Sequence, residues 1–108
     1  MNRPLAEALC PRFHKAVELI GRRWTGAVLQ MLMSGPKRFG DLRAAVPEIS
    51  DRMLSERLKE LETEGIVQRD VSQDSPVRVR YGLTEKGRAL RGPLDAIETW
   101  AHEWVPPA

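Results

Sequence analysis

The stretch PEISDRMLSERLKELETEG, residues 47–65, contains the signals of a helix start, an amphipathic helix and a helix stop. Ser50 stands at the N-cap position, Asp51 adds negative charge to the first turn, and Gly65 follows where a helix would end. Leucines recur on one side at helical spacing, as Leu54, Leu58 and Leu61. The opposite side is polar, so it is either a solvated surface or a surface that contacts a partner.

The segments around this helix complete a winged helix-turn-helix. Residues 25–34 are apolar nearly all round, which is typical of a central core helix, and a short helix around 40–46 ends at Pro47. Residues 66–71 and 77–83 alternate in polarity like two strands of a hairpin, which we call the wing. We therefore predict a mainly α fold with a small β-hairpin (α+β), in a single domain over residues 1–108.

Two further helices are expected at the ends of the chain, over about 11–21 and 84–104, with a kink or restart at Gly92-Pro93. The winged unit can close a small core without them, and large exposed apolar patches usually mark an interface. We therefore expect a homodimer held by their apolar stripes, which comprise Phe13, Val17, Leu94, Ile97, Trp100, Ala101 and Trp104. In the alternative, the two helices pack on each other within one chain.

Composition and charge limit the partners of this 108-residue chain. We see no transmembrane run and no signal peptide, and one cysteine fits a reducing compartment, so we expect a cytoplasmic protein with no membrane partner. The net charge of +2 is low for a protein that binds nucleic acid. It is unevenly spread, because residues 1–36 hold five basic and two acidic side chains, whereas residues 92–108 hold three acidic and none basic. This distribution weakly indicates an anionic partner for the rest of the chain.

The polar face of the helix at 51–64 suits the major groove of double-stranded DNA, where side chains in the N-terminal half of such a helix reach base edges. Arg52 fits guanine, and Ser55 can contact a base or a phosphate. Glu56 can accept a hydrogen bond from cytosine or orient Arg52, and Lys59 is more suited to a phosphate. The alternative is a solvated face with salt bridges, which describes most helices.

The wing carries Arg69 on one strand and Arg78 and Arg80 on the next. An arginine near such a tip can enter the narrow minor groove, whereas the alternative is an edge strand charged against aggregation. We predict that Arg78 and Arg80, on the wing, contact the DNA. Candidates for contact with the DNA backbone are Arg22, Arg23, Lys37 and Arg38.

The runs LIGRRWT (19–25), GPKRFGDLR (35–43) and PVRVRYGLTEKG (76–87), together with the helix quoted above and its continuation IVQR to residue 69, resemble the HxlR-type transcriptional regulators. These are MarR-like winged-helix proteins, and the match covers about four-fifths of the chain in order. The resemblance implies a cytoplasmic bacterial or archaeal homodimer that binds inverted-repeat operator DNA. It implies that the helix at 51–64 reads the major groove and that the terminal helices form the dimer interface.

Cys10 is the candidate redox-sensing residue. It precedes Pro11 at the expected helix start, where the helix dipole favours a thiolate, and Arg12 and Lys15 are near in sequence. In several HxlR-type proteins a cysteine at this position senses oxidants or electrophiles. With one cysteine, oxidation would give a Cys10–Cys10′ bridge across the dimer or a mixed disulfide with a small thiol. The alternative is an unreactive small residue.

Other chemistry is not expected. His14 and Glu18 follow Cys10 on one helix side, but a zinc site needs more ligands and a cysteine hydrolase needs an oxyanion hole and a third residue. We therefore expect no metal, no cofactor and no enzymatic activity. A set of large side chains can line a pocket for a flat effector, although core packing is the preferred interpretation: Trp24, Met31, Met33, Trp100 and Trp104.

We predict a sequence-specific transcriptional regulator, by default a repressor, that binds an inverted repeat as a homodimer. Its control would come from oxidation or electrophile modification of Cys10, or from a small-molecule or thiol effector. The competing class is a winged-helix module for protein–protein interaction, without specific DNA binding.

Overall fold

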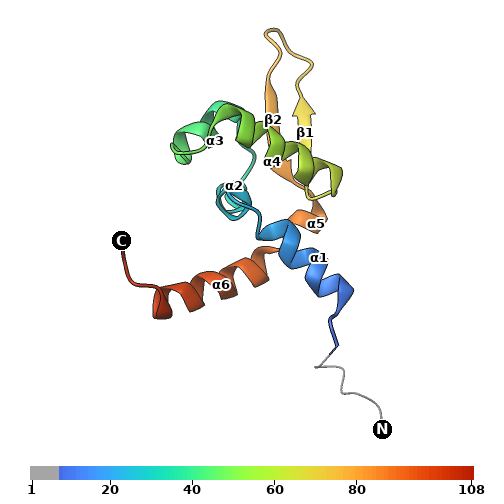
Figure 1. The fold of residues 1–108 in the computed structure, drawn as a ribbon. Coiled ribbons are helices and arrows are strands. Elements are labelled where there is room, and N and C mark those ends of the chain that lie inside the picture. Colours follow the sequence, from blue (N-terminus) through green and yellow to red (C-terminus); the bar gives the residue numbers. More distant parts are fainter. Residues whose placement is uncertain (1–7) are drawn as a thin grey trace.

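The computed structural model describes residues 8–108, which form six helices and one two-stranded antiparallel sheet (Figure 1). This is the predicted winged helix-turn-helix with helices at both ends. The elements in chain order are α1 (Pro11–Ile20), α2 (Thr25–Leu32), α3 (Phe39–Ala45), α4 (Asp51–Thr63), β1 (Val67–Val71), β2 (Val79–Leu83), α5 (Glu85–Arg88) and α6 (Arg91–Trp104).

The core lies where α2, α3 and α4 meet the base of the hairpin. Val28 and Leu29 of α2 are fully buried, which confirms the prediction that this apolar helix is central. The leucines of α4 form the facing side. The buried apolar side chains are Val28, Leu29, Leu32, Leu42, Val46, Ile49, Leu54, Leu58, Leu61, Ile66, Val67 and Leu83.

Both ends of α4 form as the sequence predicts. The Ser50 hydroxyl accepts a hydrogen bond from the Met53 N–H at 3.0 Å, which satisfies one free donor of the first turn. At the other end Gly65 takes a left-handed conformation, with φ +75°. The Gly65 N–H then donates to the Glu62 carbonyl and the Ile66 N–H to the Leu61 carbonyl, a Schellman motif that ends the helix.

The wing pairs Val67 with Leu83 at its buried base and Val71 with Val79 toward its tip. Within β2 the alternation is confirmed at Arg80, which is exposed between the half-buried Val79 and Tyr81. The strand predicted over 77–83 begins only at Val79, so Arg78 precedes it and Val77 is exposed. One pairing was not predicted: Lys37, in the loop between α2 and α3, bridges Tyr81 through two main-chain hydrogen bonds of 2.8 and 2.9 Å. This loop therefore covers one edge of the hairpin near its base.

The C-terminal segment is two helices rather than one. The restart predicted at Gly92-Pro93 occurs slightly earlier, because α5 ends at Arg88 and α6 begins at Arg91. Pro93 consequently lies in the first turn of α6, where a missing N–H costs nothing. Thr84 caps α5 by accepting a hydrogen bond from the Gly87 N–H.

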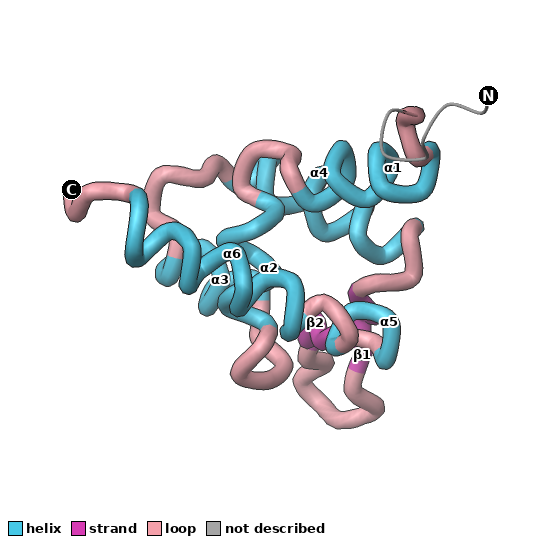
Figure 2. Tube along the Cα trace, turned by 90° about the horizontal axis from the view of Figure 1, so that it is seen from below, coloured by secondary structure: helices cyan, strands magenta, loops and turns pink. Residues whose placement is uncertain are grey.

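The two terminal helices contact the core only through a few half-buried side chains, Leu19 and Ile20 of α1 and Leu94 of α6. Neither α1 nor α6 contains a buried residue, and Figure 1 shows α6 extending away from the rest of the molecule. Seen from below, α1 and α4 lie on one side and the hairpin with α5 on the other, with α2 between them (Figure 2). Over residues 8–108, we find no helix with both the length and the apolar character needed to cross a bilayer.

Candidate nucleic-acid interface

The start of α4 is held by an arginine that sequence reasoning did not single out. Arg43 of α3 forms an ion pair with Asp51 through its Nε atom, and its Nη1 atom donates to the Ile49 carbonyl at 2.8 Å. These contacts fix the turn between the two helices of the helix-turn-helix. The first turn of α4 is therefore presented at a defined angle to α3.

The predicted polar face of α4 is exposed along its whole length. The four side chains that we assign to the major groove all lie outside the core: Arg52, Ser55, Glu56 and Lys59. None of the four has a hydrogen-bonding or ion-pairing partner among the described residues, so they are available to an external ligand. Glu56 and Lys59 also line the groove between α4 and α1, whereas Arg52 and Ser55 lie nearer the free N-terminal end.

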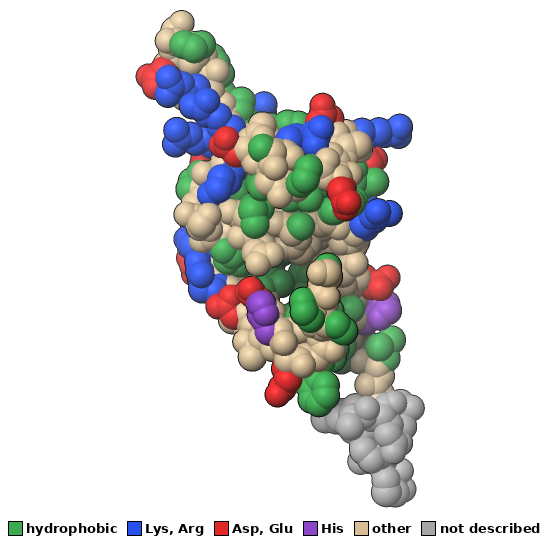
Figure 3. All heavy atoms as spheres, turned by 90° about the vertical axis from the view of Figure 1, so that its left-hand side faces the viewer, with side chains coloured by type: hydrophobic (Ala, Val, Ile, Leu, Met, Phe, Trp, Pro, Cys, Tyr) green, Lys and Arg blue, Asp and Glu red, His purple; other side chains and the backbone are tan. Residues whose placement is uncertain are grey.

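The wing presents its arginines beside α4, since β1 follows α4 directly and packs against it. Arg78 directly precedes β2, and there its N–H donates to the Ser72 hydroxyl and its carbonyl accepts from the Ser72 N–H. Arg80 is opposite Asp70, and both arginine side chains are exposed. Figure 3 shows Lys and Arg side chains gathered at the base of the projecting hairpin. The wing thus has the positive surface that phosphates attract.

The four candidates for backbone contact differ in their surroundings. Arg22 is already paired with Glu60 at 3.4 Å, and Arg23 lies over the Trp24 ring with 5.0 Å from its guanidinium to the ring centroid. The Lys37 ammonium donates to the Ser34 hydroxyl and the Gly35 carbonyl, whereas the Arg38 side chain is exposed at the start of α3. Among the four, Arg38 therefore has the charged group with the fewest contacts, whereas the charged groups of the other three already contact neighbouring residues.

Arg57 is a second residue that sequence reasoning missed. It lies on α4 among the inward leucines and is only 7% exposed. Its Nε atom donates to the Arg23 carbonyl at 2.9 Å and its Nη1 atom to the Glu60 carboxylate at 2.8 Å. The sequence does show that Arg57 is a charged residue at the edge of the leucine stripe. Helical spacing alone, however, places it between the apolar and the polar face and does not predict burial.

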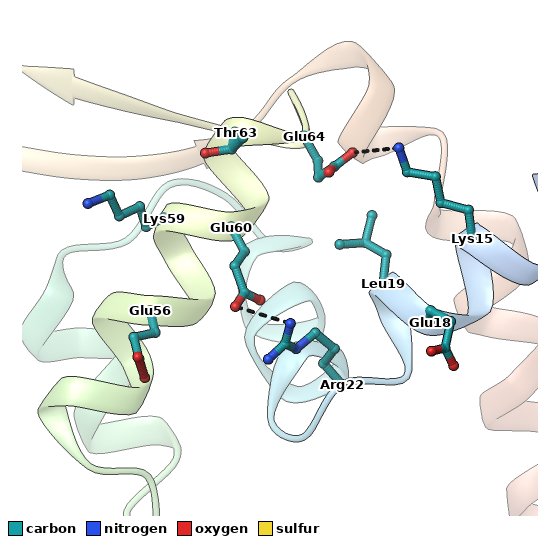
Figure 4. A pocket seen from close by; sticks show the side chains of 9 residues that line it. All are labelled: Lys15, Glu18, Leu19, Arg22, Glu56, Lys59, Glu60, Thr63 and Glu64. Carbon is teal, nitrogen blue, oxygen red and sulfur yellow. Dashed lines mark ion pairs between the residues drawn. The ribbon is translucent and has the colours of Figure 1, made fainter.

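Two grooves border α1. The groove between α1 and α4 has a volume of about 520 Å³ and is crossed by the ion pairs Arg22–Glu60 and Lys15–Glu64 (Figure 4). The groove between α1 and α5 is larger, about 700 Å³, with an aliphatic floor and a basic rim. Neither includes a tryptophan, so the effector pocket considered for these aromatic side chains stays untested in a single chain.

Cys10 lies at the start of α1, as predicted from its place before Pro11, and its side chain also caps the helix. Its Sγ accepts a hydrogen bond from the Phe13 N–H at 3.5 Å, and the side chain is an exposed free thiol. Pro11, the next residue, lines the larger groove beside α1. Across residues 8–108, no three side chains of the metal-ligating types come together.

The stripes predicted to form the dimer interface are uncovered in the single chain. Phe13 of α1 is 68% exposed, and Trp100 and Trp104 of α6 are 59% and 65% exposed. Val17 and Ile97 are likewise exposed, while Leu94 and Ala101 are half-buried. The alternative, in which α1 and α6 bury these stripes against each other within one chain, is not the arrangement observed.

Comparison with known proteins agrees with this geometry. The family model described as HxlR-like helix-turn-helix matches residues 19–108. The HTH-type transcriptional regulator YvaP of Bacillus subtilis is 50% identical over 100 residues, which is 93% of each chain. The regulator YodB of the same organism is 44% identical over 103 residues, 95% of this chain and 92% of YodB.

Solved structures show the same fold. The reduced form of YodB superimposes with a TM-score of 0.84, covering 94% of this chain and 99% of YodB. The oxidised form of the redox regulator HypR, 36% identical, gives a TM-score of 0.83 over 91% of this chain and all of HypR. The chain thus belongs to the HxlR-like helix-turn-helix family and is a DNA-binding transcriptional regulator.

Proposed function

We propose that the protein is a homodimeric repressor that binds an inverted-repeat operator. The observation that carries this proposal is the exposed polar face of α4, free of partners among the described residues, beside the basic wing. A small regulator without an activation surface acts most simply by occupying a promoter. Because its target is chromosomal DNA, the proposal places it in the cytoplasm.

A two-fold dimer through α1 and α6 is supported by shape and by charge. The apolar stripes of both helices are exposed, and burying such stripes is the usual reason for association. The two helices differ in charge, since α1 carries Arg12 and Lys15 against one acidic residue, Glu18. The charged residues of α6 are three acidic ones and one arginine: Asp95, Glu98, Glu103 and Arg91. Two-fold symmetry would place the two α4 helices about 34 Å apart, one helical turn of DNA.

The direct test is selection from random duplex DNA with the reduced protein, followed by sequencing of the retained duplexes. Recovery of an inverted repeat with half-sites about one helical turn apart is the expected result. A folded protein that enriches no sequence at low salt would instead favour the competing class, a winged-helix module for protein–protein contact. That class predicts only weak, salt-sensitive association with duplexes of any sequence.

Arg52→Ala is expected to weaken operator binding by about 1–3 kcal/mol and to relax the preference at one base pair in each half-site. The reason is that a bidentate arginine–guanine pair is lost. Affinities for the operator and for each single-base variant measure the effect. Lys59→Ala is the control, because loss of a phosphate contact should weaken all sequences equally. Uniform weakening by Arg52→Ala would make Arg52 a phosphate contact as well.

Arg78→Ala is expected to flatten the salt dependence of binding. Each neutralised phosphate contributes a slope of about −0.9 in a plot of log affinity against log salt concentration, so one lost contact reduces the slope by roughly one unit. Titrations between 50 and 200 mM salt, the range over which this effect is large, measure it. An unchanged slope would remove Arg78 from the interface.

We further propose that Cys10 controls DNA binding. YodB has been solved in reduced, diamide-treated and quinone-bound forms, and HypR in reduced and oxidised forms. In this chain Cys10 is an exposed free thiol at the start of α1, the helix that we assign to the dimer interface. Oxidation would join two Cys10 thiols across the dimer, with two electrons and two protons passing to the oxidant.

Treatment with diamide is expected to release the wild-type protein from its operator, and a thiol reductant is expected to restore binding. Cys10→Ser should bind in both conditions, because serine keeps the N-cap acceptor but cannot be oxidised. Binding assays with and without diamide measure this, and mass spectrometry distinguishes a Cys10–Cys10′ bridge from a mixed disulfide. Release of Cys10→Ser by diamide would exclude Cys10 as the sensor.

A further inference from the structure

Arg57 is the only charged residue among residues 8–108 that is buried. A buried guanidinium needs partners for its donors, and here the partners come from different parts of the chain. One is the Glu60 carboxylate, one turn further along α4. The other is the carbonyl of Arg23, in the turn between α1 and α2 and 34 positions away in sequence. Arg57 thus connects α4 to the turn between α1 and α2.

The cluster also includes Arg22. The Glu60 oxygen that accepts from Arg57 at 2.8 Å lies 3.4 Å from the Arg22 Nη1 atom, so one carboxylate is shared by both arginines. Figure 4 shows Arg22 reaching across the groove from the end of α1 to Glu60 on α4. The second ion pair across the groove, Lys15–Glu64, is longer at 3.9 Å and its lysine is 74% exposed, so it contributes little.

The turn that Arg57 holds has an unusual backbone. Trp24 has φ +76°, a left-handed conformation that a bulky residue rarely adopts. The Arg23 carbonyl that accepts from Arg57 belongs to the peptide group directly before Trp24, and the Arg23 guanidinium lies over the Trp24 ring. Such a conformation persists only where neighbouring contacts hold it. The hydrogen bond from Arg57 connects this turn to α4, beside the longer Arg22–Glu60 ion pair.

We propose that Arg57 is a positioning residue that sets the direction of α1 relative to α4. Through this direction it sets the distance between the two α4 helices of the dimer. This inference rests on the proposed function. Leu19 and Ile20 at the end of α1 pack against the core, and α2 is anchored there from Thr25 onward. The turn over residues 21–24 joins the two helices, so it is where Arg57 can act on the direction of α1. Because α1 belongs to the proposed dimer interface, its direction fixes where each α4 lies relative to the two-fold axis.

Half-site spacing is therefore the property that Arg57 should control. Adding one base pair between half-sites changes their separation by about 3.4 Å and their relative rotation by about 34°, so a rigid dimer prefers one spacing strongly. A dimer whose α1 can tilt accommodates several spacings at similar affinity. A residue that only stabilised the fold would change the melting temperature and leave the spacing preference of the folded protein unchanged.

The test compares operators whose half-site spacing is altered by one or two base pairs. Arg57→Met keeps much of the side-chain volume and removes all donors, and Arg57→Lys keeps the charge without the two-pronged geometry. The measured quantity is the ratio of the affinity for the best spacing to the affinity for spacings one base pair longer or shorter. For both variants we expect this ratio to fall by about fivefold or more. The affinity for an isolated half-site should stay near that of the wild type. The matched control is Arg88→Met, which also loses one charge and one hydrogen bond to a carbonyl, at Leu83, away from the turn.

If Arg57→Met does not fold, Glu60→Gln tests the same cluster, because it removes the charge that Arg57 and Arg22 share and leaves the bond from Arg57 to the Arg23 carbonyl. The Glu60 side chain is 32% exposed, so the fold should tolerate this change. Its control is Glu64→Gln, which removes the weaker ion pair across the same groove. A spacing profile for the folded Arg57 and Glu60 variants that matches the wild type would overturn the inference alone. A wild-type protein without any spacing preference would overturn the proposed dimeric operator binding instead.

Discussion

Replacing Trp100 with aspartate is expected to convert the protein to a monomer and to lower its affinity for the inverted repeat by about 10²–10⁴-fold. Trp100 is 59% exposed on α6, in the stripe with Ile97 and Trp104 that no other part of the described chain covers. An aspartate there puts a charge into a surface that the proposed dimer desolvates. Each monomer would then bind one half-site without the gain in effective concentration that a linked second half-site supplies.

Sedimentation velocity and operator titration together measure this effect. His102→Asp is the matched control, because it introduces the same charge two residues away on the other side of α6, where His102 is exposed beside Glu98. This variant should stay dimeric and keep its affinity. A dimeric Trp100→Asp protein with unchanged affinity would show that the association surface lies elsewhere.

Leu54→Ala is expected to lower the free energy of unfolding by about 2–5 kcal/mol. Leu54 is fully buried on the inner side of α4, and its removal leaves a cavity between α4 and the rest of the core. A small domain has a total stability of roughly 5–15 kcal/mol, so this single change would remove a large part of it. Urea unfolding at one fixed protein concentration measures the difference, since dimerisation makes stability depend on concentration.

Ser55→Ala is the control, because the neighbouring side chain is exposed and should change stability by no more than about 0.5 kcal/mol. The two substitutions, Leu54→Ala and Ser55→Ala, therefore distinguish the buried side of α4 from its exposed side by their different effects on the free energy of unfolding. Leu54 supports the fold, whereas Ser55 belongs to the surface assigned to DNA. A loss below about 1 kcal/mol for Leu54→Ala would mean that the core closes around the missing side chain.

Local signals were enough to predict α4. Its start at Ser50, its end at Gly65 and its leucine side all follow from spacing and capping, which depend on neighbours within a few residues. The alternation along the wing likewise predicted that Val79, Tyr81 and Leu83 of β2 face the core, whereas Gly82 on the opposite side is covered by Pro36. The exposure of the α4 polar face therefore needed no tertiary information.

The partners of individual arginines could not be predicted in this way. Arg22 and Lys37 are candidates for contact with the DNA backbone, yet Arg22 is paired with Glu60 and Lys37 is hydrogen-bonded to Ser34 and Gly35. The pairing of Arg22 depends on how close α4 comes to the end of α1, which a pattern of charges in the sequence does not specify. The same is true of Arg43, whose contact with Asp51 joins two helices.

By itself the sequence determined the order of helices and strands, the two sides of α4 and the unburied stripes at both ends, because hydrophobic periodicity and caps act locally. Only the tertiary structure decided that Arg57 is buried and joined to the Arg23 carbonyl, and that Gly87 must be glycine. A Cβ at Gly87 would lie 2.2 Å from the Ile66 carbonyl oxygen. Both results depend on the approach of segments distant in sequence, which is set by the close packing of the whole domain.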